Sequence, residues 1–273
     1  MTAPSGITET ALDTDDGASI AITVLEPPAR ARTVVLVHGW GGARAVWDAV
    51  VPRLTERGHR IVLYDQRGHG ASTIGRAGVS LARLCGDLAA VLAYTGTTGA
   101  VLAGHSGGGY AALKYASGDQ GADTRLHGLV LISTAAHDQD TSAGELRMMG
   151  SSIFSWALRR PVLGRRLLGQ MVGPGADTLI AERTRRMFAA TPARVRTAYF
   201  AISNGMDLRP GLTELDIPAV VLAGSEDRII KPSYGAELAR ILPSVRHEEL
   251  AGAGHTLPLE RPEDIVRAVT VLT

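Results

Sequence analysis

Six short, almost entirely apolar runs alternate along this 273-residue chain with segments of helical periodicity, and this alternation narrows the choice of fold most. Strands of a parallel sheet have this composition when helices cover both faces of the sheet. The runs are Thr33–Val37, Arg60–Tyr64, Ala100–Ala103, Leu129–Ile132, Ala219–Ala223 and, with weaker character, Arg246–Leu250. Between them, apolar residues recur on one helical face, as in 46–54 and 81–92. The pattern predicts an α/β fold with a mostly parallel, doubly wound sheet.

Two segments depart from this alternation. Near the N-terminus, Ile7–Leu12 and Ala18–Leu25 flank the turn signal Asp15-Asp16-Gly17, which predicts a β-hairpin. From about residue 137 to residue 210 no buried-strand run occurs, and helical segments broken by Gly and Pro fill the interval. An insertion of that length between two strands is typical of a lid. We therefore expect a core domain, formed by residues 1–136 and 211–273, that is interrupted by a helical cap at 137–210.

Composition excludes several classes of function. The 28 Lys and Arg residues nearly balance the 27 Asp and Glu residues, so the net charge of +1 gives no general electrostatic reason to bind nucleic acid or an anionic membrane. The single cysteine, Cys85, cannot form an internal disulfide or a thiolate zinc site. No run approaches a bilayer-spanning length, and the first residues lack a signal-peptide pattern. A cytoplasmic protein without membrane insertion, metal or organic cofactor is expected.

The strongest chemical signal is Gly-x-Ser-x-Gly at Gly104, Ser106 and Gly108. A predicted strand precedes the motif and a helical segment, 110–116, follows it, which is the setting of a nucleophile elbow. The glycines avoid side-chain clashes where strand and helix approach, and the helix N-terminus directs partial positive charge toward the serine. The motif predicts Ser106 as a nucleophile. A tight glycine turn with a solvated serine is the alternative.

A serine hydroxyl needs a base to remove its proton and an acid to orient that base. Asp227 and His255 follow two successive predicted strands, so both lie in loops at the carboxyl edge of the sheet, where ligand sites of open α/β sheets gather. The chain order Ser, Asp, His is the one expected for a nucleophile elbow. We predict that Ser106, Asp227 and His255 converge. The alternatives are Glu226 as the acid, Asp227 as a helix cap, and His255 as a surface residue.

Stabilising a tetrahedral intermediate requires hydrogen-bond donors at the developing oxyanion. The glycine-rich segment His38-Gly39-Trp40-Gly41-Gly42 follows the first buried strand, and its glycines allow backbone N–H groups to turn into the site. We predict that the backbone N–H groups of Trp40 and Gly107 form this oxyanion hole.

The expected cap concentrates residues suited to recognition. It contains all three phenylalanines and five of the six methionines, whereas the sheet-forming part of the chain is built mainly from Val, Leu, Ala and Gly. The predicted pocket residues are Phe154, Trp156, Met187, Phe188 and Phe200. Residues 138–210 also carry eleven arginines against six acidic residues, a charge excess that would attract an anionic substrate unless it forms a solvated helix face.

Taken together, these motifs resemble the α/β-hydrolase superfamily over essentially the whole chain. The matching pieces are His38-Gly39-Trp40, Tyr64-Asp65-Gln66-Arg67-Gly68-His69-Gly70-Ala71-Ser72, Gly104-His105-Ser106-Gly107-Gly108, Gly224-x-x-Asp227-x-x-x-x-Pro232 and Gly252-x-Gly254-His255. The resemblance implies an α/β-hydrolase fold of the serine esterase or lipase-like branch with a helical cap, and for His38, His69 and His105 it implies structural roles.

We accordingly expect a serine hydrolase that cleaves a carboxylic ester or related acyl substrate through an acyl-enzyme at Ser106. Alternatives with the same three residues are a carbon–carbon bond hydrolase, a thioesterase or acyltransferase, and a cofactor-free haloperoxidase or perhydrolase. A non-catalytic small-ligand-binding protein on this scaffold is an alternative of another class. The expected partner is a small acyl substrate, while the natural substrate and the oligomeric state are not indicated by the sequence.

Overall fold

The predicted fold class is confirmed by the computed structural model, which describes residues 6–28, 31–118, 126–139 and 142–273. Eight strands form one sheet in the order β1-β2-β4-β3-β5-β6-β7-β8, in which the pairs β1/β2 and β2/β4 are antiparallel and all others parallel. The strands are β1 Gly6–Asp13, β2 Ser19–Glu26, β3 Thr33–Val37, β4 Arg60–Tyr64, β5 Ala100–His105, β6 Leu126–Ile132, β7 Ala219–Gly224 and β8 Val245–Leu250.

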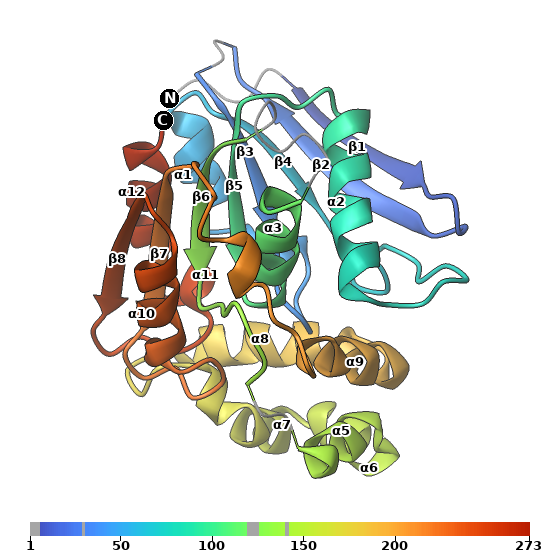
Figure 1. The fold of residues 1–273 in the computed structure, drawn as a ribbon. Helices are drawn as coiled ribbons and strands as arrows, with labels where there is room; N and C mark the ends of the chain where they lie inside the picture. The colour runs from blue at the N-terminus through green and yellow to red at the C-terminus, as the bar shows by residue number, and fades with distance from the viewer. Residues whose placement is uncertain (1–5, 29–30, 119–125, 140–141) are drawn as a thin grey trace.

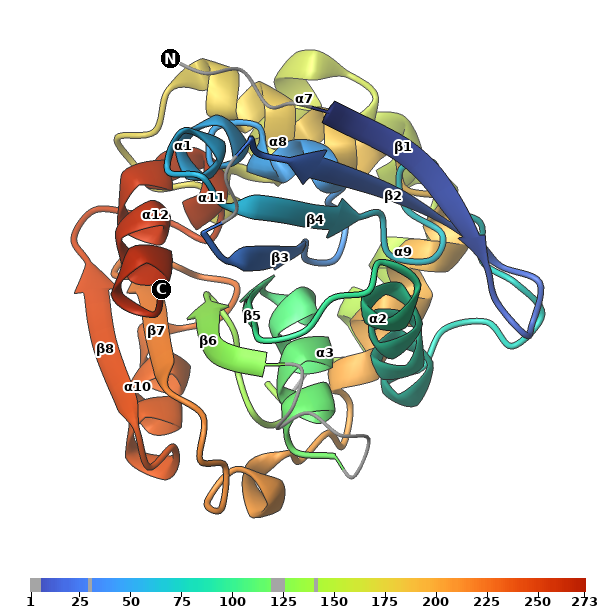
Figure 2. The same ribbon diagram turned by 90° about the horizontal axis from the view of Figure 1, so that it is seen from above.

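Helices cover both faces of this sheet, as the apolar strands require (Figures 1 and 2). On one face, buried residues of α2 (Leu81–Tyr94), α3 (Gly107–Ala116) and α10 (Pro232–Ile241) form one core cluster with the strands. On the other face, the 3₁₀ turn η1 (Arg44–Trp47), α1 (Val51–Glu56), α11 (Leu257–Glu260) and α12 (Pro262–Val271) form a second cluster. Burying two apolar faces in this way is the main stabilising contribution to such a domain.

Two local departures from the predicted pattern have simple causes. The expected helical face 46–54 is divided into η1 and α1, because Pro52 occupies the first turn of α1 and starts a new helix there. Strand β8 forms although its middle is charged, because it lies at the edge of the sheet and its residues 246–249 are exposed.

Within the described residues, the interval between β6 and β7 consists of helices joined by loops and contains no strand. Its α-helices, called the cap helices below, are α5 Ala143–Gly150, α6 Ser152–Leu158, α7 Pro161–Leu167, α8 Thr178–Ala190 and α9 Ala193–Phe200. Short 3₁₀ turns follow at η2 Gly169–Met171, η3 Ala201–Ser203 and η4 Arg209–Gly211. An isolated bridge joins His137 to Asp207, so the two ends of the interval meet. In Figure 1 the cap helices lie beyond the carboxyl ends of the parallel strands, with α5, α6 and α7 farthest from the sheet.

Candidate active site

Ser106 occupies a sharp turn between β5 and α3. Its backbone angles, φ 52° and ψ −122°, are rare for a non-glycine residue and hold the side chain away from both elements. A Cβ atom on Gly104 would lie 2.7 Å from the carbonyl oxygen of Gly108, and one on Gly108 would lie 2.4 Å from the carbonyl oxygen of Val37. Both glycines are therefore required by close backbone packing around the serine, as the motif predicts.

The three residues predicted to converge lie within hydrogen-bond distance of one another. The Nε2 atom of His255 is 3.1 Å from the Oγ atom of Ser106, and its Nδ1 atom is 2.8 Å from the Oδ2 atom of Asp227. All three side chains are buried, although their residues are 28 or more positions apart in the chain. Donation from Nδ1–H to the carboxylate leaves Nε2 free to accept the serine proton.

The carboxylate of Asp227 is held as an anion. Burial alone would raise its pKa, but the charge and hydrogen bond of His255 lower it, and the backbone N–H groups of Ile229 and Ile230 lower it further, so the net pKa falls below its usual value. These amides donate to Oδ1 at 2.8 and 2.9 Å, which leaves Oδ2 for the histidine. Asp227 rather than Glu226 contacts His255. The N-cap residue of the following helix, α10, is Lys231 and not Asp227.

The backbone amides of Trp40 and Gly107 lie side by side next to the serine. A Cβ atom on Gly107 would be 3.6 Å from the Trp40 nitrogen, and one on Gly39 would be 2.8 Å from the Cβ atom of Ser106. Within the described part of the chain, neither amide donates a hydrogen bond to another protein group. Gly107 is the first residue of α3, where an N–H group has no partner within the helix. The two amides are thus available to a bound oxygen.

Two buried histidines fix the loop that carries Trp40. The Nε2 atom of His38 accepts the N–H of Gln66 at 2.9 Å, and the Nε2 atom of His69 accepts the N–H of Gly41 at 3.0 Å. Both roles require a neutral ring. Burial lowers the pKa of His38, and burial together with the nearby His38 lowers the pKa of His69 to about 3.

Replacing His69 with glutamine is expected to reduce the slope with which the free energy of unfolding falls at acidic pH. In the unfolded chain His69 is protonated below its ordinary pKa of 6.5, whereas in the folded protein its pKa is about 3. Between these two values the unfolded state binds one more proton, so the free energy of unfolding decreases as the pH falls through this window. One such histidine changes the free energy of unfolding by about 1.4 kcal/mol per pH unit in this window. A glutamine side-chain oxygen can still accept the Gly41 N–H but does not titrate, so the variant should lack this contribution. Urea unfolding of both proteins across that window measures the slopes.

The matched control for this experiment is His127→Gln, because His127 is exposed on β6. The slope of this variant should equal that of the unmodified protein. An unchanged slope for His69→Gln would contradict a neutral, buried role for His69.

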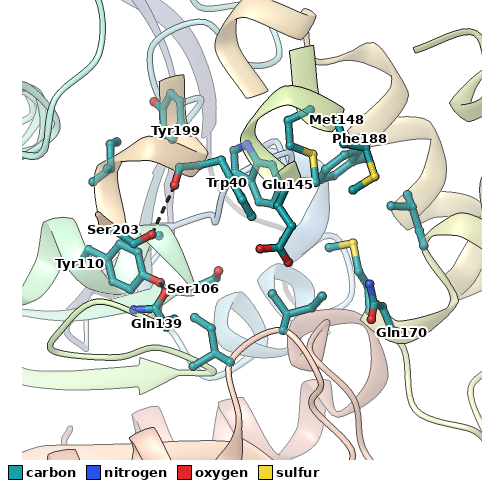
Figure 3. A pocket seen from close by; sticks show the side chains of 18 of the residues that line it. Trp40, Ser106, Tyr110, Gln139, Glu145, Met148, Gln170, Phe188, Tyr199 and Ser203 are labelled. Atoms are coloured by element: carbon teal, nitrogen blue, oxygen red, sulfur yellow. Dashed lines mark hydrogen bonds between the residues drawn. The ribbon is translucent and has the colours of Figure 1, made fainter. Parts of the chain in front are cut away.

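Ser106 opens onto an apolar cavity of about 450 Å³ (Figure 3). Of the predicted pocket residues, Phe154, Phe188 and Phe200 line it, together with Trp40 and Gly107. Trp40 is packed between two of these rings, 4.8 Å from Phe188 and 5.0 Å from Phe200 between centroids. The segment between β6 and β7, with its helices, 3₁₀ turns and loops, supplies most of the lining residues.

Two predicted pocket residues do not line the cavity. Trp156 is 54% exposed on the outer face of α6, because that helix turns Phe154 inward and Trp156 lies almost opposite it around the helix. Met187 packs against the core cluster beside α1, whereas its neighbour Phe188 faces the cavity. Sequence reasoning missed Tyr110, Gln139 and Met171, which also line it.

The cavity wall is not basic. No arginine of the described chain lines it, and its one charged lining residue there is Glu145, whose carboxylate points into the cavity in Figure 3. Hydrogen bonds from the backbone N–H and hydroxyl of Ser142 lower the pKa of Glu145. Several cap arginines are instead paired with acids, as Arg165, Arg185 and Arg186 are with Glu182. The charge excess predicted for this segment therefore lies outside the cavity.

Glu260 is a further residue that the sequence motifs did not reveal. Its carboxylate accepts hydrogen bonds from the N–H groups of Gly173 and Gly254, both at 2.9 Å, and from the N–H and hydroxyl of Thr256. The N–H of His255 also donates to the carbonyl of Met171 at 3.0 Å. These contacts join the loop carrying His255 to the segment that follows α7. An acidic residue directly after the apolar run Leu257-Pro258-Leu259 is the only sequence signal for this role.

Comparison with known proteins agrees with this geometry. A family model described as serine aminopeptidase S33 (Hydrolase_4) matches residues 28–262, which is most of the chain. The chain belongs to this family of α/β hydrolases. The AB hydrolase superfamily protein YisY of Bacillus subtilis is 27% identical over 86% of this chain and 88% of its own length.

Two further proteins are similar to this chain over most of its length. The "Probable oxidoreductase EphD" of Mycobacterium tuberculosis is 27% identical over 94% of this chain, which spans about half (48%) of that longer protein. The solved structure of the esterase RhEst1 from Rhodococcus sp. has a TM-score of 0.81 and 26% identity, and the match covers 97% of each chain. Membership of a hydrolase family supports an enzymatic function.

Proposed function

We propose that the protein is a serine hydrolase that cleaves carboxylic esters through an acyl-enzyme at Ser106. The observation that carries the proposal is the hydrogen-bonded series of Ser106, His255 and Asp227 at the floor of an apolar cavity. Likeness to an esterase structure supports the same reaction class. As part of the proposal, residues 137–210 act as a cap on a core formed by 1–136 and 211–273, since residues of this segment supply most of the cavity wall.

In the first half-reaction, His255 Nε2 takes the proton of the Ser106 hydroxyl while Oγ attacks the carbonyl carbon of the ester. The carbonyl oxygen becomes an oxyanion, which accepts hydrogen bonds from the N–H groups of Trp40 and Gly107. Asp227 stabilises the imidazolium and holds its orientation. His255 then donates its proton to the alkoxide oxygen, the carbon–oxygen bond breaks, and the alcohol leaves.

In the second half-reaction, a water molecule loses a proton to His255 and attacks the acyl-enzyme carbonyl carbon. The same two amides stabilise the second oxyanion. The serine oxygen leaves and recovers the proton from His255, so a carboxylic acid is released and the free enzyme is restored.

Turnover of nitrophenyl esters of graded acyl length, combined with fluorophosphonate labelling, tests the proposal. A hydrolase should release many equivalents of nitrophenol per protein and should incorporate one fluorophosphonate group at Ser106. Stoichiometric binding of the ester without turnover would instead favour the ligand-binding alternative and contradict an enzymatic role.

Truncating Phe200 is expected to shift acyl-chain preference toward longer chains. Its ring lines the cavity and lies against Trp40, yet it is only partly buried, so alanine lengthens the cavity without leaving a sealed void. The ratio of kcat/KM for a longer ester to that for a shorter one should rise about tenfold, since one methylene in an apolar pocket changes discrimination by that order.

The matched control is Trp156→Ala, which removes an aromatic ring outside the cavity. This variant should keep the original chain-length profile for soluble esters. If Phe200→Ala also kept it, the cavity would not be the acyl site.

A further inference from the structure

Exposed apolar side chains are concentrated on two neighbouring cap helices. Ten large apolar side chains are exposed in the described chain, and half of them lie in residues 153–167, on α6 and α7. The three most exposed of these are Ile153 at 77%, Val162 at 75% and Trp156 at 54%. We use the name α6–α7 surface for the exposed apolar and arginine residues of these two helices and the turn between them. They are Ile153, Trp156, Arg159, Arg160, Val162, Leu163, Arg166 and Leu167.

The α6–α7 surface is the uncovered side of a pair of amphipathic helices. Phe154, Ala157 and Leu158 of α6 and Gly164 of α7 are buried and face the rest of the cap. Ile153, Trp156 and Val162, on the opposite side, are each more than half exposed. In Figure 1 the two helices lie at the end of the molecule farthest from the sheet. A cluster of this kind marks an interaction site rather than chance exposure.

The charge of the same surface is one-sided. Residues 151–169 contain four arginines and no acidic residue, although the whole chain carries a net charge of only +1. Arg165 is paired with Glu182. Within the described residues, Arg159, Arg160 and Arg166 form no ion pair, and the Arg160 guanidinium lies 5.1 Å from the centre of the Trp156 ring. Exposed apolar residues are thus interspersed with unpaired cations.

We propose that the α6–α7 surface docks onto an anionic lipid bilayer. Apolar side chains on one helical face enter the boundary between headgroups and acyl chains, and a tryptophan is favoured at that depth. Arginines beside them interact with lipid phosphates and with the negative surface potential. A second copy of the chain fits this surface less well, because a symmetric contact between identical surfaces would bring unpaired arginines together.

The α6–α7 surface adjoins the cavity. Leu167 belongs to the α6–α7 surface, is 38% exposed and also lines the cavity. Met148 of the adjacent α5 is 42% exposed and lines the cavity as well. The apolar surface is therefore continuous with the cavity wall, so docking would place the cavity beside the bilayer. An acyl chain could then reach the cavity without crossing water.

Cosedimentation with phosphatidylcholine vesicles, with and without about 30% phosphatidylglycerol, tests the proposal. The protein should bind the anionic vesicles at least tenfold more tightly than the neutral ones, and binding should weaken as salt is added. Trp156 fluorescence should shift to shorter wavelength on binding, and the shift should disappear in Trp156→Phe. Because binding is scored by sedimentation and not by turnover, its failure would leave the proposed hydrolase function standing.

The double variant Ile153→Ser/Val162→Ser should lose at least tenfold in affinity for anionic vesicles while keeping its unfolding temperature and its turnover of soluble esters. The matched control is Ile7→Ser, which removes a 61% exposed isoleucine from β1 and should bind normally. Absence of binding, equal binding to neutral vesicles, or equal loss in the control would overturn the proposal. So would concentration-dependent self-association that the double variant abolishes without any change in vesicle binding.

Discussion

Replacing Ser106 with alanine is expected to lower the kcat for ester hydrolysis by about six orders of magnitude, because the variant loses the nucleophile and, with it, the function of the base. The free histidine cannot substitute, since its Nε2 atom would have to activate water in a site arranged around the serine oxygen. Substrate binding should change little, because the cavity wall is otherwise intact. Steady-state kinetics and fluorophosphonate labelling measure both effects.

Ser133→Ala is the matched control for this experiment. Ser133 also lies at the carboxyl end of a strand, is buried and has a positive φ of 45°, and its hydroxyl has no hydrogen-bond partner within the described residues. Its replacement should leave kcat within a few-fold of the original. Retention of activity and labelling by Ser106→Ala would show that the nucleophile lies elsewhere.

Asp227→Asn is expected to lower kcat by about 10⁴-fold with little change in fold. An amide can still accept the N–H groups of Ile229 and Ile230, but it no longer stabilises the imidazolium, and it favours the wrong histidine tautomer. Glu226→Gln removes a carboxylate from the adjacent position, which does not contact His255, and should retain activity. The comparison of kcat for the two variants decides between the two acids that the sequence leaves open, and equal losses would contradict the geometry.

The sequence predicts the sheet and the convergent residues well because both depend on local rules. Strands that are buried on both faces, such as β3 and β4, need nearly continuous apolar sequence. Short apolar runs at residues 33–37 and 60–64 therefore indicate strands directly. Ser106, Asp227 and His255 each follow a strand, so parallel topology alone brings them to one edge of the sheet. The edge strand β8 is harder to predict because exposed edges tolerate charge.

The orientation of the cap helices is harder to predict from the sequence. These helices are short, and which of their side chains face the cavity depends on how the helices pack against one another. Helix α6 has seven residues, too few for periodicity alone to show that Phe154 points inward and Trp156 outward. The excess of arginines over acidic residues in this segment also does not predict a basic cavity. A buried cation is costly unless it is paired or hydrogen-bonded, so most of these arginines lie on the surface or beside acids, and Glu182 alone contacts three of them. Arg196 is the buried exception among the described residues, and it donates hydrogen bonds to the Thr191 carbonyl and the Ser155 hydroxyl.

Trapping of the acyl-enzyme tests the central proposal most directly. The protein would be mixed with a nitrophenyl ester, quenched in acid during the first turnover, digested and examined by tandem mass spectrometry. We expect the mass of the acyl group on Ser106, in an amount equal to the burst of nitrophenol. Turnover without an adduct, or an adduct on another residue such as Cys85, would contradict hydrolysis through Ser106.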